Sequence, residues 1–175
     1  MGLVMDVVEP GEVFVNIPEF PGYFVSNFGR VWSDKMGGKM MKPWDRNGYL
    51  SVNLYKDGVV TTRKIHQLVA RAFVPNPENK PCVNHIDRDR QNNVVTNLRY
   101  ATKSENQWNR GSIAGSSSRY VGVFWEARRQ KWKAQIQIDG KSKYLGYFTD
   151  EAAAARAYNA AAREHHKEFA RCNFE

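Results

Sequence analysis

The spacing of hydrophobic residues changes along the chain and predicts short strands first. Between residues 13 and 60, short apolar runs alternate with turn signals such as Pro21-Gly22 and Asp57-Gly58. From Tyr49 to Tyr55 the side chains alternate between polar and apolar positions. This period of two predicts antiparallel strands with one buried and one wet face, and Asp57-Gly58 predicts a tight hairpin turn.

A helix is predicted after these strands. Ile65, Leu68, Val69, Ala72 and Phe73 fall at helical spacing and form one apolar stripe. Proline cannot continue a helix, so Pro75 and Pro77 end it. Two short strands are expected at 83–86 and 98–101, followed by a second helix. Its start has the S/T-x-x-E form of a capping box, with Thr102 as N-cap and Glu105 three residues later.

The C-terminal third predicts a sheet and one helix. Three strand-like runs lie at 121–125, 132–138 and 143–148, and an alanine-rich helix runs from Asp150 to about Lys167. In the middle strand Ala134, Ile136 and Ile138 share one face, while Lys133, Gln135 and Gln137 share the other. Residues 111–118 are small and polar, which is typical of a flexible linker. The expected fold class is therefore α+β.

Composition narrows the class of protein. The chain has 175 residues, is 42% hydrophobic, and has no apolar run of the roughly 18–20 residues that a membrane span needs. Cys82 and Cys172 lie far apart without a CxxC pair, which excludes a disulfide framework and a zinc ribbon. The net charge is +8. Residues 1–24 carry −4, residues 25–110 carry +8 and residues 111–175 carry +4. Two basic regions favour salt-dependent binding of nucleic acid, with a solubilising surface as the alternative.

The stretch VNHIDRDRQNNVVTNLRYATKSEN at 83–106 resembles the HNH nucleases, whose ββα-metal motif holds one divalent cation against a scissile phosphate. The segments before it, including IPEFPGYFVSNFGRVWSD and IHQLVARAFVPNPENKP, resemble the N-terminal part of phage and intron-encoded homing endonucleases. The resemblance covers residues 14–110. It implies an N-terminal strand-rich, DNA-contacting region at 1–60 and a central nuclease unit at 61–110.

The resemblance implies a role for each of four residues. His85 would be the general base, since an imidazole with a pKa near 6.5 suits this task. Asn84 and Asn106 would coordinate Mg²⁺ or Mn²⁺, and Asn97 would pin the loop and orient His85. Asn106 stands where the name-giving pattern has His. Two neutral amides bind a hard cation weakly, so tight binding is expected only when DNA supplies phosphate oxygens, with Asp87 as a reserve ligand.

Other histidines have simpler interpretations. His66 lies beside the apolar stripe of its helix and is interpreted as a packing or capping residue. His165 and His166 are expected at the carboxyl end of the last helix. The alternative for His85 itself is a structural turn histidine. The loop 87–93 lacks the spacing and terminal Glu of an EF-hand, so a calcium site is discounted.

Residues 119–175 resemble the DNA-binding domain of plant ethylene-response (APETALA-type) factors, a three-stranded sheet packed on one helix. The matching motifs are YVGV, KWKAQIQI, YLGYF and AAARAYNAAA. The resemblance implies that Gln135, Gln137 and Tyr144 read base edges in the major groove. The basic side chains assigned to phosphates are Lys133, Arg128, Arg129 and Lys143. Val121 and Phe124 stand where plant members carry Arg, so the plant target sequence is not carried over.

Together these features predict a site-specific DNA endonuclease of the homing or mobile phage type. It would use one divalent metal and nick one strand of double-stranded DNA as a monomer, in the cytoplasm of a bacterial or phage-infected cell. The alternative is a non-catalytic, sequence-specific DNA-binding regulator with a decayed HNH unit. An RNA-binding protein is less favoured because there is no aromatic RNP-type motif.

Overall fold

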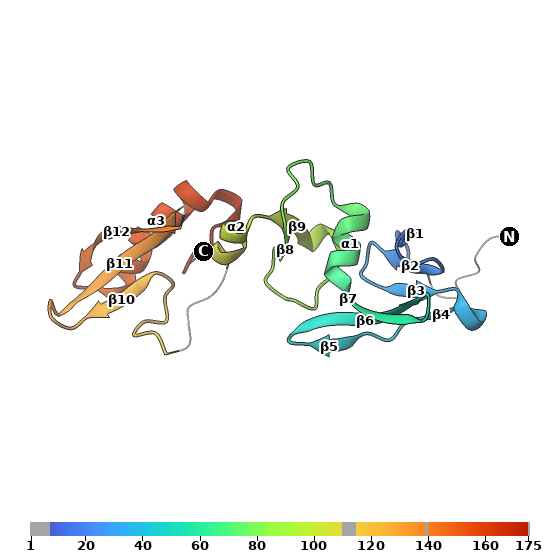
Figure 1. Ribbon diagram of the computed structural model, residues 1–175. Coiled ribbons are helices and arrows are strands. Elements are labelled where there is room, and N and C mark those ends of the chain that lie inside the picture. Colours follow the sequence, from blue (N-terminus) through green and yellow to red (C-terminus); the bar gives the residue numbers. More distant parts are fainter. Residues whose placement is uncertain (1–7, 110–114, 139, 175) are drawn as a thin grey trace. The chain divides into compact units, whose positions relative to one another are not determined.

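The computed structural model describes residues 8–109, 115–138 and 140–174. Contacts divide the chain into two units, Met1–Tyr100 and Ala101–Glu175, and both contain antiparallel sheets and helices (Figure 1). The α+β class expected from the sequence is confirmed. The boundaries expected at residues 60, 110 and 118 remain predictions, and the division between units falls at none of them. No helix in the described ranges is long and apolar enough to cross a membrane.

The first unit opens with a sheet of four short antiparallel strands in the order β1-β2-β3-β4. Its elements are β1 Phe14–Asn16, β2 Tyr23–Ser26, β3 Val31–Ser33, the 3₁₀ turn η1 Lys35–Gly37 and β4 Lys39–Met40. Glu12 forms an ion pair with Arg30, and Glu19 Oε1 lies 2.7 Å from Arg71 Nη1. Arg30 also lies 3.5 Å from Glu9, so two arginines of the same unit pair with the described carboxylates of the acidic N-terminal segment.

A second sheet in this unit has three antiparallel strands: β5 Trp44–Arg46, β6 Tyr49–Lys56 and β7 Val59–Lys64. Asp57 and Gly58 have φ angles of 49° and 81°, the positive values that a type I′ hairpin turn needs. The expected hairpin is confirmed. Asn53 is exposed between the buried Val52 and Leu54, as the alternation predicts. Ser51, expected on the wet face, is buried because β5 and β7 flank it on both sides.

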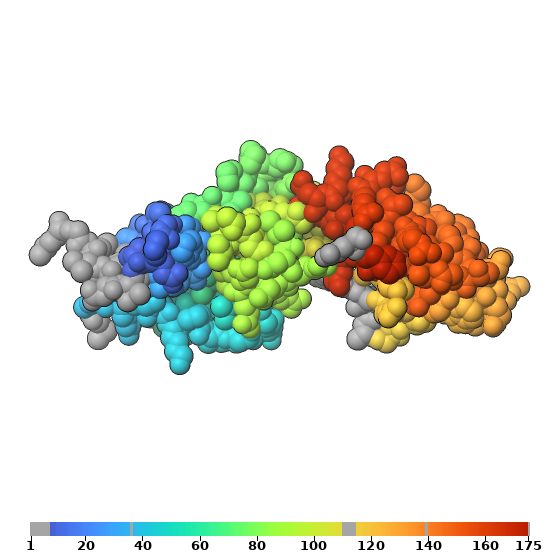
Figure 2. All heavy atoms as spheres, turned by 180° about the vertical axis from the view of Figure 1, so that it is seen from behind, coloured from blue at the N-terminus to red at the C-terminus, as the bar shows by residue number. Residues whose placement is uncertain are grey.

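The helix and strand pair that follow complete one core. α1 (Ile65–Phe73) starts directly after β7 and buries Leu68 and Val69, as its apolar stripe predicts. The remaining elements are β8 Cys82–His85, the 3₁₀ turn η2 Val95–Asn97 and β9 Leu98–Ala101. Val25, Leu54, Leu68 and Leu98 belong to one hydrophobic cluster. Figure 2 shows the blue N-terminal strands in contact with the green α1 region.

The second unit begins at the capping box. The Thr102 side chain accepts from the Glu105 N–H, the Glu105 carboxylate accepts from the Thr102 N–H, and the box predicted from the sequence is confirmed. The elements are α2 Lys103–Trp108, β10 Val123–Glu126, β11 Lys131–Ile138, β12 Lys141–Phe148, α3 Glu151–His166 and the 3₁₀ turn η3 Lys167–Phe169. The sheet order is β10-β11-β12, and Ala134 of β11 packs on Ala155 of α3, which confirms the expected sheet-and-helix module. Trp108 stacks on His166 with ring centroids 4.2 Å apart.

Part of the expected linker is folded onto the second unit. Residues 111–114 lie outside the described residues. Ser117 Oγ accepts from the Trp125 N–H at 2.9 Å, and the buried Ser118 hydroxyl donates to Glu151 at 2.7 Å. The composition of 115–118 matches a flexible linker, but these hydroxyls form hydrogen bonds with β10 and α3.

Candidate active site

His85 ends β8 inside a cluster of rings contributed by three elements. Its ring centroid lies 5.0 Å from that of His66 on α1, and the two rings meet edge on at 69°. Tyr49 of β6 lies 5.0 Å from His66 and 6.2 Å from His85. His85 is 5% exposed and His66 is 4% exposed. Packing therefore fixes the orientation of the His85 ring, as a positioned proton acceptor requires.

A hydrogen bond selects one neutral tautomer of His85. His85 Nε2 lies 3.1 Å from Asn93 Oδ1. An amide oxygen only accepts, so Nε2 donates its proton and Nδ1 carries the lone pair of a general base. Burial lowers the pKa of His85 below its ordinary value, and the Asn93 bond and the Asp87 charge oppose that shift only in part. The imidazole is therefore neutral near pH 7.

Asn93 is positioned by the turn between β2 and β3. Gly29 in this turn has a φ of 83°, and a Cβ at Gly29 would lie 2.8 Å from the Asn93 Cβ. That approach requires glycine. Close by, the Val95 N–H donates to the Asn27 carbonyl at 2.8 Å. The N-terminal sheet therefore supports the loop that holds His85.

Asn97 closes the loop between β8 and β9. Its Nδ2 donates to Asp87 Oδ1 and to the Asn92 carbonyl, both at 2.8 Å, and its Oδ1 accepts from the Asp87 N–H at 3.0 Å. The Asn97 carbonyl also accepts from the Ile86 N–H at 2.9 Å, next to His85. These bonds hold the loop shut directly after the candidate base. Asp87, the reserve ligand, has its carboxylate engaged in this loop.

The two expected metal ligands lie on different elements. Asn84 of β8 is buried, and its Oδ1 accepts from Arg99 Nε of β9 at 3.1 Å. Asn106 lies in α2 of the second unit, where its backbone N–H donates to the Thr102 carbonyl at 3.0 Å. Its expected role beside His85 stays a prediction.

The C-terminal sheet gathers most of the residues expected to contact DNA. Lys133, Gln135 and Gln137 alternate with the buried Ala134 and Ile136, so they point away from α3. Tyr144 pairs with Gln135 across the strands and is 53% exposed. Arg128 and Arg129 lie in the turn before β11, and the Arg129 guanidinium lies 4.9 Å from the Tyr147 ring.

Lys143 lies apart from that face. Its Nζ is 3.4 Å from His165 Nε2 on α3. It pairs with the inward-facing Ile136, so its position in the register directs it to the helix side of the sheet. The sequence analysis assigned Lys143 to phosphates together with Lys133, whereas the register places these two lysines on opposite faces of the sheet.

Comparisons with known proteins identify the family. A family model described as HNH endonuclease matches residues 63–108, and one described as the NUMOD4 motif matches residues 12–55. DNA endonuclease I-HmuI of Bacillus phage SP01 is 35% identical over 124 residues, which are 69% of this chain and 70% of that protein. The chain belongs to the HNH endonuclease family.

Further relatives agree with the HNH assignment. The solved structure "DNA binding and cleavage by the HNH homing endonuclease I-HmuI" aligns with a TM-score of 0.51 and 29% identity, covering 89% of this chain and 94% of that chain. An uncharacterized HNH endonuclease of Acanthamoeba polyphaga mimivirus is 44% identical over 85 residues, 48% of this chain and 26% of the relative. The match to a second uncharacterized HNH endonuclease of the same virus covers 25% of that relative's length. The chain thus spans about a quarter of these two relatives. The APETALA-type resemblance of residues 119–175 stays a prediction.

HNH endonucleases generally depend on a divalent metal, and the described residues suit a weakly bound one. Within the described ranges, no group of three or more His, Cys, Asp or Glu side chains could hold an ion. Hard cations bind oxygen, and an amide oxygen has two lone pairs. Asn84 supplies such an amide oxygen, which accepts from Arg99 Nε. An uncharged oxygen ligand of this kind fits a metal ion that also needs phosphate oxygens as ligands.

Sequence reasoning missed three residues around His85. His66 was interpreted as a packing residue. It does pack, but against the candidate base itself. Tyr49 was seen only as part of an alternating strand, and no local pattern connects it to His85. Asn93 lies in the Asn-rich loop, which the sequence analysis considered only as a possible calcium site. The one sequence signal for its contact with His85 was the short separation of eight residues.

Proposed function

We propose that the chain is a site-specific DNA endonuclease of the homing or mobile phage type, which hydrolyses a phosphodiester bond in double-stranded DNA. The observation that carries this proposal is the buried His85, whose Nε2 bond to Asn93 leaves Nδ1 as the basic nitrogen. A relative named as a DNA endonuclease and one named as an H-N-H endonuclease support it.

The proposed chemistry assigns one task to each side chain. His85 Nδ1 takes a proton from the water that attacks the scissile phosphorus. Asn97 holds the loop closed, so that the base keeps its position. Asn84, oriented by Arg99, and Asn106 would hold Mg²⁺ or Mn²⁺, which when bound stabilises charge on the phosphate and the leaving oxygen.

The remaining surfaces would hold the duplex. The N-terminal strands at 1–60 contact DNA, and the C-terminal sheet reads base edges through Gln135, Gln137 and Tyr144. Lys133, Arg128 and Arg129 contact phosphates, whereas Lys143 lies on the helix side of the sheet and adds little to this contact. One His85 per chain means that a monomer nicks one strand. The enzyme would act in the cytoplasm of a bacterial or phage-infected cell.

The test begins with selecting cleaved sites from a random duplex library and cloning one site into a supercoiled plasmid. The wild-type chain with Mg²⁺ should yield open-circular product, and a chelator should abolish it. His85→Ala should lower the nicking rate by at least about 100-fold. His165→Ala, which changes a histidine of the second unit, should nick at the wild-type rate.

A gel shift of the same variants separates the two candidate classes. His85→Ala should still bind the selected site. A wild-type chain that binds the site but yields no open-circular DNA beyond the His85→Ala level would favour the non-catalytic regulator. Linear product formed without an open-circular intermediate would contradict nicking by a monomer.

A further inference from the structure

A hollow of about 300 Å³ lies in the first unit between the second sheet and α1. Its lining comes from β5, β7 and α1 and consists of Arg46, Thr62, Arg63, Lys64, Gln67 and Arg71. Four of these six side chains are cationic, and none is a carboxylate. We call this feature the cationic hollow.

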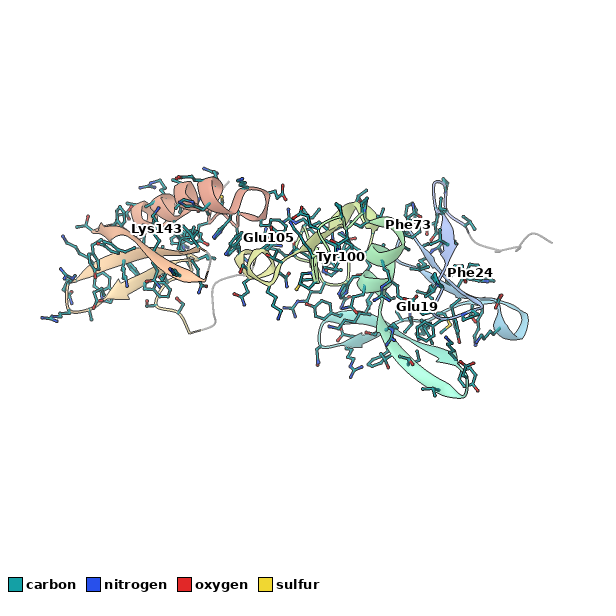
Figure 3. All side chains as sticks on the ribbon, turned by 45° about the horizontal axis from the view of Figure 1, so that its top comes forward. Glu19, Phe24, Phe73, Tyr100, Glu105 and Lys143 are labelled. Carbon is teal, nitrogen blue, oxygen red and sulfur yellow. The ribbon has the colours of Figure 1, made fainter. Side chains whose placement is uncertain are left out.

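Neighbouring groups hold two of the cations in place. The Arg63 guanidinium lies 5.2 Å from the Phe20 ring centroid. Arg71 Nη1 lies 2.7 Å from the carboxylate of Glu19, which Figure 3 labels. Gathering four like charges is unfavourable without an anion, and Glu19 offsets only one of them. The excess charge therefore favours an anionic ligand.

The start of α1 adds a second feature that favours anions. Lys64 is the N-cap of this helix, and no side chain caps it. Lys64 and Gln67 of the first turn both line the cationic hollow. The backbone N–H groups of a first helical turn lack intrahelical acceptors, and the helix dipole favours negative charge there.

The cationic hollow adjoins the ring cluster of His85. Lys64 Nζ lies 4.1 Å from the Tyr49 ring centroid, and Arg46 pairs with Tyr49 across β5 and β6. Tyr49 in turn lies 6.2 Å from His85. A strand of DNA with its scissile phosphate at His85 can therefore pass the hollow.

We propose that the cationic hollow binds a backbone phosphate of double-stranded DNA, outside the active site. The inference rests on the proposed endonuclease function and adds a phosphate site to it. Arginine forks match phosphate oxygens. None of the six lining side chains is aromatic, so the lining suits a phosphate and offers no ring on which a base could stack.

The test measures the salt dependence of binding to a fluorescent duplex of arbitrary sequence, in chelator so that no cleavage occurs. Each lost phosphate contact lowers the slope of log K against log salt by about 0.9. The double variant Arg46→Gln/Arg71→Gln removes two ligands of this one phosphate and should therefore lower the slope by about 0.9. The charge-matched control Arg156→Gln/Arg163→Gln changes exposed arginines of α3, outside the surfaces proposed to contact DNA, and should keep the wild-type slope.

A charge-preserving variant separates binding from folding. Arg46→Lys/Arg71→Lys should retain most of the slope, and all three double variants should unfold cooperatively near the wild-type temperature. A folded Arg46→Gln/Arg71→Gln chain with the wild-type slope would overturn the phosphate site, even if the wild type nicks DNA. A lowered slope in a chain that cannot nick would support the site and refute the nuclease. A wild-type chain that binds no duplex would overturn both.

Discussion

The imidazole of His66 meets that of His85 edge on, with ring centroids 5.0 Å apart. Burial lowers the pKa of His66 to about 3, and the neighbouring His85 and Lys64 add to this shift. A proton on His66 would place a charge in a buried cluster without a carboxylate partner among its ring neighbours. The candidate base is therefore packed against a ring that stays neutral at physiological pH.

Acid should destabilise the first unit because the unfolded chain binds a proton that folded His66 excludes. The stabilisation from neutral His66 is complete above its ordinary pKa of 6.5 and is lost as pH falls toward about 3. The loss should be about 1.4 kcal/mol per pH unit in this window. Urea unfolding at about pH 7, 6 and 5 measures it.

A variant can assign this acid sensitivity to His66. His66→Phe keeps a ring in the cluster and should reduce the pH slope by about one proton, leaving the smaller contribution of His85. Equal slopes in wild type and His66→Phe would show that another group carries the acid sensitivity.

Gly29→Ala should slow nicking by displacing Asn93. The new Cβ would lie 2.8 Å from the Asn93 Cβ and 3.0 Å from its carbonyl oxygen, so the partner of His85 Nε2 must shift. We expect kcat to fall by about tenfold while KM changes little, because orientation of the base is lost rather than DNA affinity.

The matched control is Gly58→Ala. Gly58 has a similar φ of 81°, but a Cβ there meets nothing within 4 Å. Both variants should lose about 1 kcal/mol or more of stability through backbone strain. Only Gly29→Ala should lose activity. Equal nicking rates in the two variants would refute a role for Asn93 in positioning His85.

Asn84→Asp should tighten Mg²⁺ binding in the absence of DNA. A carboxylate adds the charge that an amide lacks, and Arg99 Nε remains beside it as a partner. Titration calorimetry should show a Kd lower than wild type by about tenfold or more. Asn47→Asp adds the same charge at an exposed turn and should leave the Kd unchanged. Tight binding of Mg²⁺ by the wild-type chain in the absence of DNA would contradict a weak metal site built from amide ligands.

Lys133 and Lys143 should differ in their contribution to DNA binding. Lys133 lies on the sheet face away from α3, so Lys133→Gln should lower the salt slope by about 0.9. Lys143 lies against His165, so Lys143→Gln should leave the slope nearly unchanged. The measurement is duplex binding by fluorescence anisotropy over a range of salt. The opposite ranking would place the DNA on the helix side of the sheet.

Features set by short stretches of chain could be predicted from the sequence. The Asp57-Gly58 hairpin, the Thr102–Glu105 capping box and the apolar stripe of α1 each depend on local dihedral preference, local hydrogen bonds or helical period. The HNH stretch from Val83 to Asn106 likewise identified the family, because its residues follow one another in order. Buried Ser51 and the folded Ser118 were missed because their burial comes from other elements.

The environment of the candidate base was decided by tertiary structure. Tyr49, His66 and Asn93 reach His85 from a strand, a helix and a loop, and their packing depends on how the core brings these elements together. The cationic hollow likewise joins Arg46, Lys64 and Arg71 from three elements. The sequence by itself determined the local elements and the family, and it pointed to His85 as the candidate base. Only the fold decided which distant side chains set the tautomer of His85 and which cationic side chains lie together near it. Such contacts follow from packing and leave no local periodic pattern.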